Sequence, residues 1–143
     1  MSQALPGFRI LVADDDRVIA KTMSQILRLS GYDVDVVCSG EEAVTVAAKT
    51  GPDVFISDVL MGGITGIEAA IRILEIVPAC RVILISGHAN TAHRLDGAHH
   101  KKHNFEILSK PVHPKVLLER IAAFATERTI AHMQRDIQSI ARY

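Results

Sequence analysis

The chain has 143 residues, of which 48% are hydrophobic and 22% charged, and sixteen basic side chains balance sixteen acidic ones. This length suits one domain, and the neutral balance argues against nucleic acid as a direct partner, because phosphate binding needs a basic excess. No stretch approaches the roughly 20 apolar residues of a membrane span, and residues 1–10 lack the pattern of a secretory signal. With only two cysteines, far apart in the chain, we expect a cytoplasmic protein with free thiols and no membrane partner.

Short apolar runs alternate with helical patterns along the chain. Runs rich in Val, Ile and Leu predict buried parallel strands at 8–13, 33–38, 53–57, 81–86 and 105–109. Ser39 and Glu42 form a capping box before the second helix, and Pro114 opens the last one. The weakest helical pattern, at 90–103, has few apolar residues, and we interpret its histidines as a solvated helix end instead of zinc ligands. The alternation predicts an α/β fold, a five-stranded parallel sheet doubly wound with helices on both faces.

Polar residues follow four of the predicted strands at their carboxyl ends, where ligands of open α/β sheets bind. These residues are Asp14, Asp15, Asp16, Asp58, Ser86 and Lys110. Carboxylates near one point repel unless a cation neutralises them, and oxygen ligands without His or Cys favour Mg²⁺. Lys110 and Ser86 would surround a phosphoryl group with positive charge and a hydroxyl donor, and a carboxylate such as Asp58 could accept that group.

Four motifs carry a family resemblance: ILVADDD (10–16), DVFISDVLMGGITGIEAA (53–70), VILISGH (82–88) and ILSKPVHP (107–114). Over residues 8–126 the sequence resembles the receiver domain of two-component response regulators, whose fold is flavodoxin-like. The resemblance implies that Asp58 accepts a phosphoryl group from a sensor histidine kinase, a phosphotransfer protein or a small-molecule phosphodonor. It also implies a set of roles: Mg²⁺ held by Asp14, Asp15, Asp58 and the backbone carbonyl of Leu60, phosphoryl oxygens bound by Ser86 and Lys110, and a cis Lys110–Pro111 bond. Asp16 falls outside this set, and we interpret it as a solvated residue of the first helical turn.

Some positions differ from the family's usual residues, and others lie where the family varies the access of water to the site. Residues 61–63 read Met-Gly-Gly where the family usually has Met-Pro, which predicts a more flexible loop. Ile107 stands where the family usually has a switch aromatic, so the usual coupling of that ring to the hydroxyl residue is not expected. Leu60 and His88 occupy the positions at which the family tunes the access of water to the acyl phosphate.

The tail 127–143 carries a helical stripe of its own, formed by Ile130, Met133, Ile137 and Ile140. The stripe points away from the apolar face of the preceding helix, so one straight helix cannot bury both against its own sheet. Either the helix breaks near 126–129, or the tail packs against another molecule, and we favour self-association. We expect a helical extension here and no separate output domain.

The leading hypothesis is a stand-alone receiver that acts as a phosphorylation-controlled switch and turns over no external substrate. Its output surface would be the face formed by 90–103, 105–109 and the helix after Pro114, which would bind an unknown downstream protein or a second copy. A pseudo-receiver, folded but not phosphorylated, is one alternative. The other is a phosphatase of the haloacid dehalogenase type, with Asp14 as nucleophile and Asp16 as general acid–base. It lacks the expected acidic pair after Lys110 and leaves Asp58 without a role.

Overall fold

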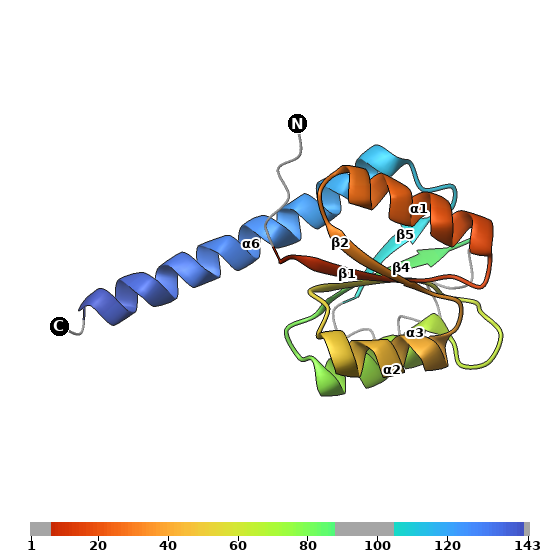
Figure 1. The fold of residues 1–143 in the computed structure, drawn as a ribbon, viewed down its shortest axis with the longest axis horizontal. Helices are drawn as coiled ribbons and strands as arrows, with labels where there is room; N and C mark the ends of the chain where they lie inside the picture. The colour runs from red at the N-terminus through yellow and green to blue at the C-terminus, as the bar shows by residue number, and fades with distance from the viewer. Residues whose placement is uncertain (1–6, 88–104, 142–143) are drawn as a thin grey trace.

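A computed structural model describes residues 7–87 and 105–141 of the chain. The strands are β1 (Arg9–Ala13), β2 (Asp33–Val37), β3 (Val54–Asp58), β4 (Arg81–Ser86) and β5 (Glu106–Ser109). They pair in parallel in the order β2-β1-β3-β4-β5, with the chain's first strand inside the sheet (Figure 1). This is the flavodoxin-like order of doubly wound sheets, so the predicted fold class is confirmed. The helix predicted at 90–103 lies outside the described residues.

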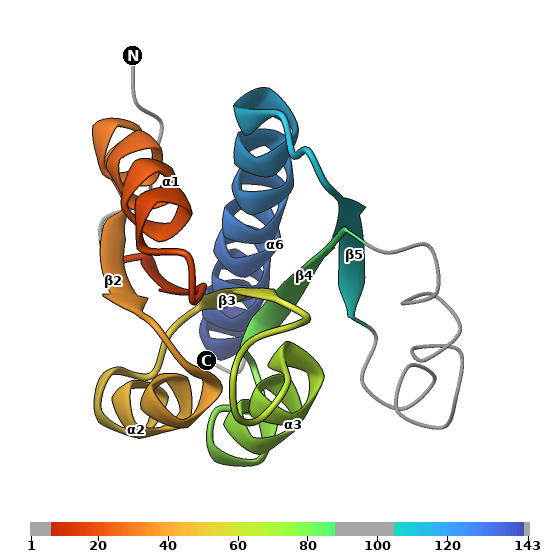
Figure 2. The ribbon, with the colours of Figure 1, turned by 90° about the vertical axis from the view of Figure 1, so that its right-hand side faces the viewer.

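Among residues 7–87 and 105–141, two pairs of helices cover the two faces of the sheet (Figure 2). The helices are α1 (Arg17–Leu29), α2 (Gly40–Thr50), α3 (Gly66–Ile76) and α6 (Pro114–Ala141). Alternate residues of each central strand enter different cores: Leu11 packs with α2 and α3, whereas Ile10 packs with α1 and α6. Because both faces are covered, the strands need no polar alternation, which is why they appear as continuous apolar runs in the sequence.

The second helix begins and ends at the predicted local signals. The Ser39 hydroxyl accepts the Glu42 N–H at 3.1 Å, and the Glu42 carboxylate accepts the Cys38 N–H at 3.3 Å. The helix stops at Gly51, whose φ of 60° is left-handed and costs a glycine little. These caps fix where α2 begins and ends, and its first turn lies at the carboxyl edge of the sheet.

The last helix does not break near 126–129, one of the two alternatives that the sequence left open. It contains no Gly or Pro after Pro114 and runs unbroken to Ala141. Two ion pairs tie its middle to the amino edge of the sheet, Arg81 to Glu127 at 2.6 Å and Arg128 to Asp53 at 2.7 Å. Beyond them, α6 projects away from the sheet (Figure 1) with every residue from 130 to 141 exposed. Within residues 7–87 and 105–141, none of the helices combines the length and the apolar character needed to cross a membrane.

Candidate functional site

Three carboxylates meet at the carboxyl edge of the sheet. Asp14 follows β1, Asp15 comes next, and Asp58 ends β3, the neighbour of β1. One oxygen from each of the three lies within 4.8 Å of the others. The register, with Ala13 opposite Ser57, brings Asp14 and Asp58 to the same level of the sheet. An all-oxygen group of this kind suits a hard divalent cation, so the cluster could bind a metal ion.

Asp14 is the least exposed of these three carboxylates, with 4% of its surface accessible to water. It accepts the Asp16 N–H at 2.9 Å. Burial raises the pKa of Asp14, and the charges of Asp58 and Asp15 raise it further, against the lowering effects of the Asp16 N–H and of Lys110. The metal-free cluster is therefore electrostatically unfavourable, and a bound cation would relieve it.

Lys110 reaches the cluster from the loop after β5. Its Nζ donates to Asp58 Oδ2 at 2.7 Å, and this hydrogen bond raises the pKa of the lysine, which stays charged. The Lys110 N–H donates to the Ser86 carbonyl at 2.8 Å, which fixes the loop to the end of β4. The Lys110–Pro111 bond is cis, as the resemblance implies. The other oxygen of Asp58, Oδ1, accepts the Leu60 N–H at 3.3 Å.

The remaining predicted residues differ in how the structure places them. Ser86 ends β4 and is buried, one residue beyond Ile85, the partner of Asp58 across the strands. The Leu60 side chain is 41% exposed two residues after Asp58, and Ile107 packs partly buried against the core beneath α2 and α3. His88 lies outside the described residues.

Asp16 corrects one interpretation made from the sequence. It is the N-cap of α1 and not a residue of the first turn, because its Oδ1 accepts the Val18 N–H at 3.0 Å and the Ile19 N–H at 3.2 Å. An Asp directly before a helical run is the usual signal for this role. Asp16 is not part of the acidic cluster and is already engaged by the helix.

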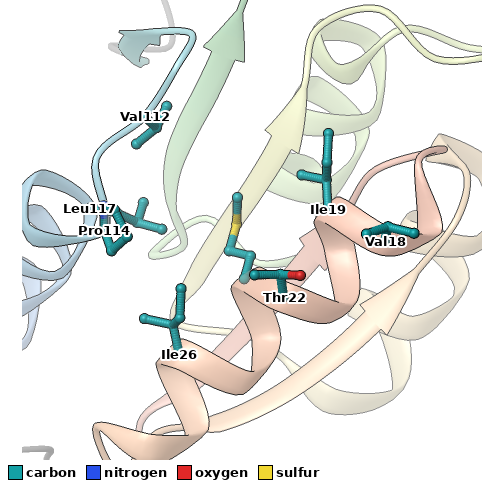
Figure 3. Close-up of a pocket in the computed structure, with 8 residues that line it drawn as sticks. Val18, Ile19, Thr22, Ile26, Val112, Pro114 and Leu117 are labelled. Carbon is teal, nitrogen blue, oxygen red and sulfur yellow. The ribbon is translucent and has the colours of Figure 1, made fainter.

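An apolar groove beside the site was missed by the sequence analysis. It lies between α1 and the start of α6, has a volume of about 250 Å³, and is lined by Val18, Ile19, Met23, Val112 and Leu117 among others (Figure 3). Val18 is 74% exposed and Ile19 40%, and Val18 lies three residues after Asp15 in the chain. A helical pattern alone marks this face as apolar, but only the tertiary structure shows that α6 leaves part of it uncovered.

Comparisons with known proteins agree with this arrangement. Residues 10–122 match the family described as the response regulator receiver domain. The chain belongs to this family, and it is the receiver domain of a two-component response regulator.

Individual relatives share only a modest sequence identity with this chain. The DNA-binding response regulator MtrA of Mycolicibacterium paratuberculosis is 29% identical over 115 residues, which are 80% of this chain and 50% of MtrA. The chain thus spans about half the length of the curated relatives it matches. Among solved structures, a receiver domain from Clostridium thermocellum has 26% identity and a TM-score of 0.77, with 86% of this chain and 98% of that one covered. A CheY-like receiver domain from Methanospirillum hungatei, at 24% identity, has a TM-score of 0.78 with 86% and 97% covered, and supports the fold alone.

Proposed function

We propose that this receiver domain is a switch controlled by phosphorylation of Asp58. Asp14, Asp15, Asp58 and the Leu60 carbonyl would hold Mg²⁺, which when bound neutralises the carboxylates and the phosphoryl oxygens. The observation that carries the proposal is the convergence of three carboxylates within 4.8 Å, with Lys110 Nζ 2.7 Å from one of them. This combination of oxygen ligands and a fixed ammonium group is what phosphoryl transfer to a carboxylate requires.

In the proposed reaction a carboxylate oxygen of Asp58 attacks the phosphorus of the donor. The bond from phosphorus to the donor's imidazole nitrogen, or to the oxygen of acetyl phosphate, breaks, and the leaving group keeps the electron pair. The product is an acyl phosphate on Asp58. Lys110 Nζ, held beside Asp58 before the reaction, is placed to donate to a phosphoryl oxygen afterwards, and the Ser86 hydroxyl would donate to another.

Intact-mass measurement after treatment with acetyl phosphate tests the proposal. We expect one phosphoryl adduct in Mg²⁺ and none in EDTA. If no adduct forms, beryllofluoride binding separates a short-lived acyl phosphate from a site that cannot bind the group. Failure of both would favour the pseudo-receiver alternative.

The alternative with external phosphatase activity is disfavoured by the role of Asp16. That reading needs Asp16 as a general acid–base, but its Oδ1 already accepts two backbone N–H groups at the start of α1. We therefore propose that the chain turns over no external substrate.

The phosphodonor would be a sensor histidine kinase or a phosphotransfer protein in the cytoplasm. Any protein that delivers a phosphoryl group to Asp58 must cover the rim of the site, and the exposed Val18 and Ile19 at this rim offer it apolar contact. The downstream partner would bind the surface that includes β5 and the adjoining side of α6. MtrA is named as DNA-binding, but the neutral charge of this chain supports a protein as its direct partner.

Replacing Lys110 with Ala should uncouple phosphorylation from its structural response. The ammonium group leaves one oxygen of Asp58, while the three carboxylates remain, so Mg²⁺ affinity should change by less than about threefold. The phosphorylated variant should show much smaller amide chemical-shift changes in β5 and α6 than the phosphorylated wild type. Lys115→Ala, on the exposed first turn of α6, is the control. An undiminished response would mean that Lys110 has only a structural role.

We also propose that the chain self-associates through the exposed end of α6. Ile130, Met133, Ile137 and Ile140 are 49–72% exposed and spaced alternately by three and four residues, the pattern of one strand of a coiled coil. A narrow stripe of this kind is matched by the same stripe on a second copy. The pair, with its polar flanks, would bury on the order of 1,000 Å², the lower limit for a specific interface.

Replacing Ile137 with Gln should weaken this dimer, because it puts an amide in the middle of the apolar seam. We expect the dissociation constant to rise about tenfold or more in sedimentation equilibrium. Ser139→Gln, which adds the same side chain on the opposite, exposed side of α6, is the control and should leave it unchanged. A wild-type chain that stays monomeric at high concentration would exclude this interface.

A further inference from the structure

The loop between β3 and α3, residues 59–65, is closed by a hydrogen bond at each end, one to Asp58 and one across the loop itself. At one end the Leu60 N–H donates to Asp58 Oδ1 at 3.3 Å. At the other, the Gly66 N–H donates to the Val59 carbonyl at 2.9 Å. Gly66 lies so close to the strand that a Cβ there would be 2.2 Å from the Asp58 carbonyl oxygen. The loop therefore closes tightly beside the acidic cluster, and its Leu60 carbonyl is the expected backbone ligand of the metal.

The middle of this loop is bonded to a residue from a different part of the chain. Glu41, in the first turn of α2, accepts the Ile64 N–H on Oε1 at 3.1 Å. Gly63 has a φ of 84°, and a Cβ there would lie 2.5 and 2.6 Å from the two carboxylate oxygens of Glu41. The missing side chain at Gly63 thus leaves the space that the Glu41 carboxylate uses to reach the loop.

A second contact docks the same turn of α2 on the loop. A Cβ on Gly40 would lie 2.5 Å from Ile64 Cγ1, so the helix backbone and this side chain are in close contact. Ile64 also packs against the core beneath α2 and α3. Residue 64 is therefore held through its backbone by Glu41 and through its side chain by the core. The Met-Gly-Gly segment predicted to be flexible lies between this anchor and Asp58.

We propose that Glu41 is a positioning residue for the metal site. Its carboxylate fixes the backbone at residue 64 and so limits the movement of the Leu60 carbonyl, a restraint that glycines at 62 and 63 do not supply themselves. The inference rests on the proposed Mg²⁺ site. Glu41 acts through a hydrogen bond and touches neither the metal nor the phosphoryl group.

The test compares the Mg²⁺ affinity of matched variants of the full chain by calorimetry. Glu41→Ala removes the acceptor and should raise the dissociation constant about three- to tenfold, which corresponds to one lost hydrogen bond. Glu41→Gln keeps an acceptor oxygen without the charge and should stay within about twofold of the wild type. Glu42→Gln removes the same charge from the same turn while keeping its capping acceptor, and should behave like Glu41→Gln. Exchange of the Ile64 amide hydrogen should be faster in Glu41→Ala alone.

Two results would overturn the proposal. One is a Glu41→Ala variant that binds Mg²⁺ as the wild type does, and the other is a Glu41→Gln variant as weak as Glu41→Ala, which would show an effect of charge. Gly63→Ala checks the geometry. It should lower the Mg²⁺ affinity less in the Glu41→Ala background than in the wild type, because the close contact between the added Cβ and the Glu41 carboxylate is then absent. Wild-type protein that binds no Mg²⁺ would overturn both this inference and the metal site. Wild-type protein that binds Mg²⁺ but accepts no phosphoryl group would overturn only the proposed function.

Discussion

Replacing Asp58 with Asn should eliminate the phosphoryl adduct while leaving the fold intact. An amide is not a nucleophile at phosphorus, so no acyl phosphate can form at this position. Asn has the same shape and keeps an oxygen to accept the Lys110 ammonium, which lies 2.7 Å from Asp58 Oδ2 in the wild type. Loss of one carboxylate from the cluster should also weaken Mg²⁺ binding, by about tenfold. Intact mass after acetyl phosphate treatment and a calorimetric Mg²⁺ titration measure the two effects.

Asp16→Asn is the matched control for this experiment. Asn caps helices as well as Asp does, so the start of α1 should be kept and phosphorylation should proceed as in the wild type. A phosphoryl group retained by Asp58→Asn would place the acceptor at another residue. A loss of reaction in Asp16→Asn would revive the phosphatase reading, in which Asp16 is the acid–base group.

The sheet could be predicted from the sequence because its signals are local. Each central strand is buried on both faces, so runs such as Ile83 to Ile85 stand out without reference to the rest of the chain. The Ser39 capping box likewise acts within four residues. Once the strands alternate with helices, the parallel sheet brings their carboxyl ends to one edge, and Asp14, Asp58 and Lys110 meet there.

The parts that the sequence did not predict depend on contacts between distant residues. The sequence left open whether α6 breaks near 126–129, where Arg128 pairs with Asp53, a residue far away in the chain at the amino edge of the sheet. The bond from Ile64 to Glu41 spans 23 residues. The groove beside the site exists because α6 crosses α1 without covering Val18 and Ile19. A helical period identifies an apolar face, but only packing decides how much of it stays exposed.

Replacing Asp14 with Asn should stabilise the metal-free protein and at the same time abolish most of its Mg²⁺ affinity. Asp14 is almost fully buried, and burial together with the neighbouring carboxylates raises its pKa, so its charge is unfavourable in the folded state without metal. Asn removes that charge and can still accept the Asp16 N–H, which lies 2.9 Å from Asp14 Oδ1. We expect a gain of about 1 kcal/mol at pH 7 in EDTA, a rise of a few degrees in Tm.

The difference in stability between Asp14→Asn and the wild type should depend on pH. The folded state holds the Asp14 proton more tightly than the unfolded chain does. The free energy of unfolding therefore falls as the pH rises from the ordinary aspartate pKa of 3.8 through the raised pKa of Asp14. The advantage of Asp14→Asn should therefore vanish below this window and be complete above it. Saturating Mg²⁺ should reverse the order, because a ligand at a hundredfold its Kd stabilises the wild type by about 2.7 kcal/mol and the variant hardly binds it. A variant that is less stable than the wild type in EDTA at pH 7 would mean that the Asp14 charge supports the fold and does not oppose it.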